Sequence, residues 1–313
     1  MVSKPAVMSH RSVLALHDRE TGEAVERFTT TTVREQERAA LADGAAVAGA
    51  RHHQGVKERY QEAAPATRPL REDQRAAFEH AMDAGGLKLI EGRAGTGKSY
   101  TLAAVREAHE AAGYRVVGLA PTNAVAQDLK ADGFAEAGTV HAALFAIKNG
   151  RTPSGGGGPW NKRTVLVVDE AAMLDSRATG ELLAEAKSAG AKVILAADDR
   201  QLASIERGGL FTELRRQHGA PEITEMTRQK VDWQRQAARD LAEGRFDAAV
   251  QAFDRHGAVT WTADQEAAWA ALVSRWKADT AATPQAVRDR VRVHQRRGGP
   301  AECRAAPGAA GAG

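Results

Sequence analysis

The sequence predicts an α/β fold in which helices cover both faces of a parallel sheet. Three observations support this prediction. Four short runs are almost wholly apolar, with Lys88 as their one polar residue, instead of alternating with polar residues, and helix-forming stretches separate them. Such runs are typical of strands buried on both faces. The first run also leads through a glycine-rich loop directly into a helix. The four runs are residues 87–90, 116–120, 165–168 and 193–197.

The chain before the first run predicts a small hairpin-and-helix module. Residues 12–16 and 26–30 are strand-like, with turn residues between them, which indicates a β-hairpin. Thr32 and Glu35 match a capping box and predict a helix that extends to about residue 51. The Ala/Pro-rich residues 61–69 are expected to form a linker. Residues 71–82 are expected to form a helix with Phe78 and Met82 on one face.

The remaining elements follow from periodicity and from turn residues. We expect a flexible loop at residues 149–161, where four consecutive glycines occur. We also expect a strand at residues 258–261. Helices are predicted for residues 123–130, 140–147, 178–188, 233–243, 247–256 and from 264 to about 277.

Residues 91–100 carry the strongest chemical signal. Gly92, Gly97, Lys98 and Ser99 fit the phosphate-binding pattern G-x-x-x-x-G-K-[ST], in the strand–loop–helix context that this pattern requires. Backbone N–H groups of the loop and the positive end of the helix dipole would bind an anion. Lys98 would reach the β- and γ-phosphates of ATP, and the Ser99 hydroxyl would ligate Mg²⁺. The predicted nucleotide-binding set is Gly92, Ala94, Gly95, Thr96, Gly97, Lys98, Ser99 and Tyr100.

A glycine-rich turn with an exposed lysine is the alternative interpretation of this loop. Four matched positions between a strand and a helix favour the nucleotide site.

Asp169 and Glu170 directly follow the apolar run 165–168. This is the carboxyl end of a strand, where open α/β sheets bind their ligands. Asp169 would hold Mg²⁺ through water, and Glu170 would orient and deprotonate the attacking water. Solvated acids at a strand end are the alternative for this stretch alone. Together with the phosphate loop, the pair predicts a metal ligand and a catalytic base.

The bulk composition excludes several classes of protein. The chain has 313 residues and is 43% hydrophobic, which is enough for a buried core. One cysteine, Cys303, excludes an internal disulfide framework and a cysteine-based zinc site. No apolar run approaches the roughly 20 residues of a membrane helix. The N-terminus lacks the apolar stretch of a signal peptide, so we expect a cytoplasmic protein.

The basic pI of about 9.1 comes from the end of the chain. Six arginines and two acidic residues follow Gln285, which gives that segment a charge of +4, whereas the whole chain has a net charge of +3. The remainder therefore sums to −1, and net charge does not indicate nucleic-acid binding.

Further motifs follow one another in a recognisable order, namely Gln74 and residues 120–123, 139–141, 169–171 and 197–202. Together with the phosphate loop they resemble those of superfamily 1 helicases of the RecD-like type. More narrowly, the chain from about Val13 to Lys277 resembles the helicase region of TraA-type conjugative relaxases. Residues 28–30, 70–78 and 254–259 carry this narrower likeness. The resemblance implies a RecA-like P-loop NTPase domain and ATP-dependent DNA unwinding or translocation in conjugal transfer. Single-stranded DNA and other conjugal transfer proteins are the implied partners.

The resemblance also implies roles for residues outside the phosphate loop. Gln74 would hydrogen-bond the adenine edge, Gln201 would sense the γ-phosphate, and Arg228 would stabilise charge in the transition state. The alternatives are an ordinary exposed helix residue for Gln74 and a surface arginine for Arg228. The implied DNA-binding residues are Pro121, Thr122, Asn123, Thr139 and His141. His141 taken alone is more often a buried or capping histidine.

The resembling helicases have two RecA-like domains, whereas the likeness ends near residue 283. We therefore expect four parts: an N-terminal module at residues 1–66, a RecA-like ATP-binding domain at 67–229, an incomplete second domain at 230–283, and a disordered Arg/Ala/Gly tail at 284–313. The tail is interpreted as a frameshift product or as a genuine basic tail. No tyrosine and histidine cluster for DNA nicking is recognisable.

The expected behaviour of such a chain is binding of Mg-ATP with little or no unwinding. Three alternatives stay open. They are a RecD-like DNA repair helicase, a nucleotide-binding module that does not hydrolyse, and a gene remnant.

Overall fold

The computed structural model describes residues 12–17, 22, 24–93, 95–152, 158–198, 210–225 and 231–282. The chain divides into two compact units, Met1–Arg235 and Gln236–Gly313, which are described separately. Within the described residues, no helix is both long enough and apolar enough to cross a membrane.

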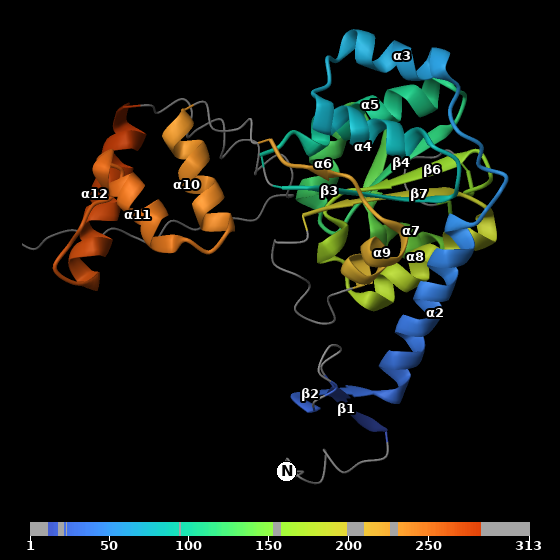
Figure 1. Cartoon of the computed structure of the whole chain (residues 1–313), viewed down its shortest axis with the longest axis horizontal. Helices are drawn as coiled ribbons and strands as arrows, with labels where there is room; N and C mark the ends of the chain where they lie inside the picture. Colours follow the sequence, from blue (N-terminus) through green and yellow to red (C-terminus); the bar gives the residue numbers. More distant parts are fainter. Residues whose placement is uncertain are drawn as a thin grey trace, which may run out of the picture. The chain divides into compact units, whose positions relative to one another are not determined.

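A six-stranded parallel sheet forms the centre of the first unit (Figure 1). The strand order is β5-β4-β6-β7-β3-β8. All four predicted strands are present, and β5 and β8 are additional short strands at the two edges. The bounds are β3 Leu87–Gly92, β4 Arg115–Ala120, β5 Glu136–Thr139, β6 Thr164–Val168, β7 Lys192–Ala197 and β8 Glu222–Ile223.

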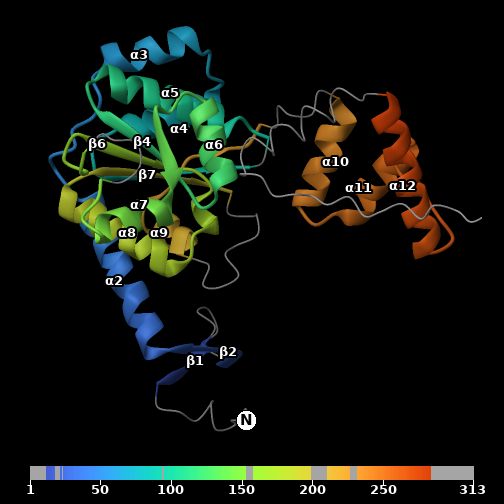
Figure 2. The same ribbon diagram turned by 180° about the vertical axis from the view of Figure 1, so that it is seen from behind.

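Helices cover both faces of this sheet (Figures 1 and 2). One face packs against α2 Thr31–Ala48, α7 Val140–Lys148, α8 Ser176–Ala189 and α9 Leu210–His218. The other packs against α4 Glu72–Met82, α5 Lys98–Ala111 and α6 Asn123–Ala131, and α3 Glu58–Thr67 lies against α5.

The four inner strands β3, β4, β6 and β7 contribute alternate side chains to two separate hydrophobic cores. Leu89 of β3 packs in one core and Ile90 in the other. In β7, Leu195 and Ala196 divide in the same way. Both faces of the strands are therefore apolar because both are covered. This arrangement confirms the predicted RecA-like P-loop α/β fold.

The N-terminal hairpin is also confirmed, with β1 Val13–His17 antiparallel to β2 Ala24–Thr30. The predicted capping box is wrong by two residues. Thr30 is the N-cap of α2, and its side chain accepts a hydrogen bond from the Val33 backbone N–H at 3.3 Å. The strand continues to Thr30 and enters the helix without a separate turn. Helix α2 packs against α8 on the same face of the sheet. The two helices approach closely at Gly180, where an added Cβ would stand 3.1 Å from the Ala40 Cβ.

The predicted linker at residues 61–69 is also wrong. Most of it belongs to α3, which ends at Thr67 and packs against α5. The Ala-rich sequence is compatible with a helix, and the packing of Tyr60 against the core under α5 stabilises it. A short 3₁₀ turn, η1 (Ala171–Met173), follows β6.

Three helices follow the α/β sandwich, namely α10 Asp232–Ala242, α11 Phe246–Arg255 and α12 Gln265–Ala282. They agree with the predicted helices, although α12 extends five residues beyond the expected end. The predicted strand at residues 258–261 is wrong, because this segment is irregular and no described strand pairs with it. The predicted tail lies outside the described residues.

Candidate nucleotide site

The phosphate loop joins the carboxyl end of β3 to the first turn of α5. Gly97 is the N-cap of α5, has a left-handed backbone (φ +85°) and offers no capping side chain. The first N–H groups of a helix have no intrahelical partners, so this uncapped end is suited to an anion. A Cβ on Gly97 would stand 2.5 Å from Nε2 of Gln74, so any larger residue here would displace the Gln74 amide.

Lys98 begins α5 and is only 8% exposed, which excludes the interpretation of the loop as a turn with an exposed lysine. Its Nζ lies 2.8 Å from Oε1 of Glu170 and 3.0 Å from Oδ1 of Asp169. Burial lowers the pKa of Lys98, but the two carboxylates outweigh burial and raise the pKa above its ordinary value. The lysine thus joins the first turn of α5 to the carboxyl end of β6, the strand over which this helix packs.

The two acids occupy the carboxyl end of β6. The Asp169 N–H donates to the Leu119 carbonyl of β4 at 2.9 Å, which continues the sheet register to the acid itself. Glu170 has φ +54° and is, within the described part of the chain, the one non-glycine residue with a positive φ. Such a backbone costs about 1–2 kcal/mol, and strain of this kind concentrates at functional sites. Its N–H donates to Asp169 Oδ1 at 2.8 Å.

The residues present fit a hydrated divalent cation beside a phosphate. The Asp169 carboxylate and the Ser99 hydroxyl are hard oxygen donors of the kind that Mg²⁺ prefers. Asp169 is buried, and Ser99 is exposed in the first turn of α5. In the described residues, no group of three or more His, Cys, Asp and Glu side chains is arranged to hold a metal ion by itself.

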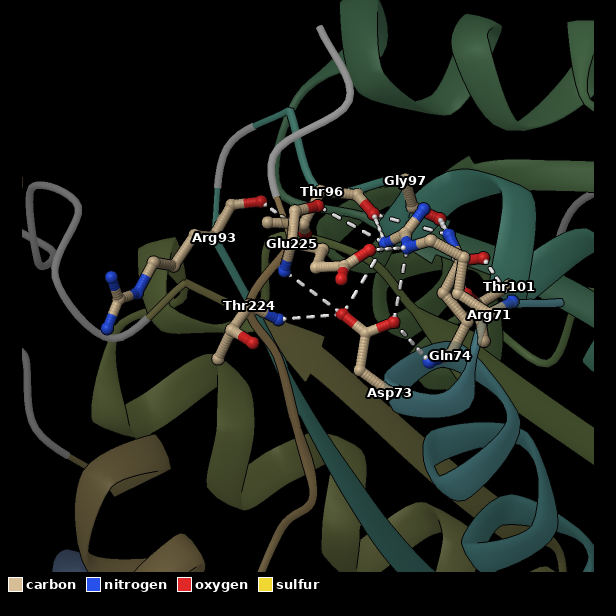
Figure 3. A network of polar contacts seen from close by, with 9 residues as sticks. All are labelled: Arg71, Asp73, Gln74, Arg93, Thr96, Gly97, Thr101, Thr224 and Glu225. Carbon is tan, nitrogen blue, oxygen red and sulfur yellow. Dashed lines mark hydrogen bonds and ion pairs between the residues drawn. The ribbon is translucent and has the colours of Figure 1, made fainter. Parts of the chain in front are cut away.

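Gln74 lies against the phosphate loop in a polar network (Figure 3). It is 3% exposed, so it is not an ordinary exposed helix residue. Its Oε1 accepts from the Arg71 N–H at 3.2 Å, and its Nε2 donates to the carbonyls of Thr96 at 3.2 Å and Gly97 at 3.4 Å. The side chain thus joins the start of α4 to the loop.

Comparison with known proteins agrees with this geometry. A family model described as an AAA domain matches residues 69–264. The chain belongs to this AAA-domain family.

Within this family, the chain is similar to conjugal transfer proteins named TraA. The chain is 32% identical over 210 residues to a conjugal transfer protein TraA of Rhizobium radiobacter, which covers 67% of this chain and 18% of the relative. A probable conjugal transfer protein TraA of Sinorhizobium fredii is 32% identical over 230 residues, which covers 73% of this chain and 20% of the relative. A conjugal transfer protein TraA of Agrobacterium fabrum gives 32% over 210 residues, with 67% and 18% covered. The chain thus spans about a fifth of the length of these relatives.

The predicted DNA-binding residues of the AAA domain follow two neighbouring strands, β4 and β5, at the same edge of the sheet. Thr122 caps α6 by accepting from the Val125 N–H at 3.4 Å, and Thr139 caps α7 by accepting from the Ala142 N–H at 3.1 Å. Each hydroxyl retains its own proton as a donor. Pro121 is half-buried and Asn123 is exposed in the first turn of α6.

His141 is exposed in α7 and is neither buried nor the helix cap. It borders a hollow of about 500 Å³ between α7 and α8, which Phe145 and Arg177 also line.

The structure brings together Gln74, the phosphate loop and the pair Asp169–Glu170. Ala94, Gln201 and Arg228 lie outside the described residues. Tyr100 is half-buried in the first turn of α5, and its ring lies 5.2 Å from the Arg68 guanidinium carbon.

Sequence reasoning assigned no role to Arg71 and Asp73, which share the network of Gln74 (Figure 3). Both belong to the stretch 70–78 that carries the family likeness, and their charges next to Gln74 in the sequence are the signal that could have found them. Asp198, buried at the end of β7, also belongs to a matched motif without an assigned role.

Proposed function

We propose that this AAA domain binds Mg-ATP, hydrolyses it, and uses the hydrolysis to move along single-stranded DNA or to unwind duplex DNA in conjugal transfer. The contact of Lys98 with both Asp169 and Glu170 carries the proposal. Phosphoryl transfer needs a cation for the phosphates, a metal ligand and a group that orients water, all in one place. These three side chains meet beside an uncapped helix N-terminus, which supports nucleotide chemistry over a purely structural ion pair.

Each residue then has a distinct task. The N–H groups at the start of α5 hold the phosphates, and Lys98 exchanges its carboxylate partners for phosphate oxygens. Asp169 and Ser99 hold the metal ion, which neutralises charge on the phosphates when it is bound. Release of Lys98 frees the Glu170 carboxylate to accept the proton of the attacking water.

The remaining assignments rest on the family likeness. Gln74 contacts the adenine edge, Gln201 senses the γ-phosphate, and Arg228 stabilises transition-state charge. Pro121, Thr122, Asn123, Thr139 and His141 contact the DNA backbone without reading sequence. The names of the curated relatives support conjugal transfer, with other transfer proteins as partners.

Nucleotide binding and ATP turnover, with and without single-stranded DNA, test this proposal. Lys98→Ala should abolish nucleotide binding. Glu170→Gln should retain binding and lower kcat about 10²- to 10⁴-fold, the usual contribution of a general base. Glu72→Gln, an exposed carboxylate in the first turn of α4, is the matched control and should behave as the wild type.

The outcomes separate the alternatives. Turnover that survives Glu170→Gln refutes the assignment of the base, and turnover that DNA does not stimulate refutes the coupling to DNA. Tight binding without any turnover would favour the non-hydrolysing module.

A further inference from the structure

The carboxylate of Asp73 holds the backbone that leaves β8 (Figure 3). Its Oδ2 accepts from the N–H groups of Thr224 at 3.1 Å and Glu225 at 3.0 Å, and its Oδ1 accepts from the Gln74 N–H at 2.8 Å. Burial raises the pKa of Asp73, but the Glu225 N–H and the Arg71 guanidinium outweigh burial and hold the pKa below its ordinary value. Asp73 is therefore an anion at neutral pH and a double acceptor for one peptide segment.

Arg71 connects the same segment to the phosphate loop. One nitrogen, Nη2, donates to the Thr96 carbonyl at 2.9 Å and to the Glu225 carbonyl at 3.2 Å. Its Nε forms an ion pair with Glu225 Oε2 at 2.9 Å. Thr96 is fully buried between two loop residues with positive φ, Gly95 and Gly97. A shift of this loop therefore moves the carbonyl that Arg71 holds.

Strand pairing alone does little to fix the chain beyond β8. The strand has two residues, and its register pairs are Glu91 with Glu222 and Gly92 with Ile223. The N–H groups of the next two residues, Thr224 and Glu225, bind the Asp73 carboxylate and no described strand. The neighbouring acid Glu72 lies in the same helical turn but is exposed. An acid that only stabilised the helix dipole would work equally well at either position.

We propose that Arg71 and Asp73 are positioning residues that couple occupancy of the phosphate loop to the segment leaving β8. The proposal rests on the proposed function, because the loop must bind nucleotide. Three residues beyond Glu225 in the sequence is Arg228, the predicted charge-stabilising arginine. Arg71 and Asp73 therefore connect the phosphate loop to a segment that lies only three residues before this arginine in the sequence.

Amide hydrogen exchange of Thr224 and Glu225, with and without Mg-ATP or Mg-ADP, tests the coupling in the full chain. In the wild type, nucleotide should slow this exchange by about 5- to 150-fold, the usual range of coupling between sites. Asp73→Asn weakens the acceptor, and Arg71→Lys keeps the charge but loses the planar fork that reaches two carbonyls. Both variants should reduce the nucleotide-dependent slowing to less than about 3-fold.

Reciprocity gives a second readout. Nucleotide affinity should fall in both variants, because nucleotide and the closed segment favour each other in the coupled protein. The matched controls are Glu72→Gln and Arg75→Lys, which make the same chemical changes at exposed positions of the same helix. Both controls should behave as the wild type.

A purely structural role predicts a different pattern. Exchange would then rise equally with and without nucleotide in the variants, and this result would overturn the inference. Wild-type protein that binds nucleotide without slowing exchange at Thr224 and Glu225 would also overturn it while leaving the proposed function intact. Wild-type protein that binds no nucleotide would refute the proposed function and, with it, this coupling.

Discussion

Lys192, the first residue of β7, gives a pH dependence of stability that can be worked out from the structure. Its side chain is buried, and Nζ donates to the carbonyls of Ala81 at 2.8 Å and Asp83 at 2.9 Å, at the end of α4. Burial lowers the pKa of Lys192 from 10.5 to about 7, with a further lowering from Lys88 and an opposing effect from Asp83.

The sign follows from proton linkage. A base whose pKa is lower in the folded state binds fewer protons when folded, so the free energy of unfolding rises with pH between the two pKa values. Each pH unit inside this window contributes up to about 1.4 kcal/mol, and a rise from pH 7 to pH 9 should therefore add about 2 kcal/mol. Burial lowers the pKa of His53 to about 4 and of His109 to about 3, so neither titrates in the window.

Urea denaturation followed by circular dichroism between pH 7 and pH 9 measures this effect. The wild type should gain about 2 kcal/mol relative to Lys192→Met over this range, because methionine removes the titrating group and leaves other groups in place. Lys130→Met, a change at an exposed lysine of α6, is the control and should keep the wild-type slope. Parallel profiles for wild type and Lys192→Met would refute the reasoning.

Two further predictions concern the site. Gly97→Ala should cost about 1–2 kcal/mol of stability from its left-handed backbone and should also weaken nucleotide binding, because the added Cβ meets Gln74; unchanged affinity in a nucleotide titration would contradict this. Thr139→Val should cost about 1 kcal/mol because it removes the cap on α7, whereas Thr139→Ser should retain the cap and the proposed DNA contact. Equal affinity of the two variants for single-stranded DNA would argue against that contact.

The buried strands of the sheet could be predicted because their sequence reflects their environment. Residues 165–168 and 193–197 are apolar throughout, and both faces of β6 and β7 are covered. The edge strands carry no such pattern. β5 is Glu-Ala-Gly-Thr and is a strand because it pairs with β4, and β8 is two residues long and pairs only with the end of β3.

Errors arose where a local pattern competes with a tertiary contact. Residues 61–69 contain the turn signals of a linker, yet packing against α5 keeps most of them helical. Residues 258–261 have the composition of a strand, but no described strand lies beside them to form a sheet. Thr30 and Thr32 could both cap α2. Thr30 is the cap because β2 ends at this residue and the helix begins at the next.

By itself, the sequence determined the phosphate loop, the acids after β6 and the positions of the four buried strands along the chain. These features are local. Each depends on a few adjacent residues, either glycines that permit a tight loop or apolar side chains that require burial. Only the tertiary structure decided that Lys98 contacts Asp169 and Glu170, and that Arg71 and Asp73 join the loop to the end of β8. Those contacts join residues from 25 to 154 positions apart in the sequence, and the fold of the sheet and its helices brings them within hydrogen-bond distance.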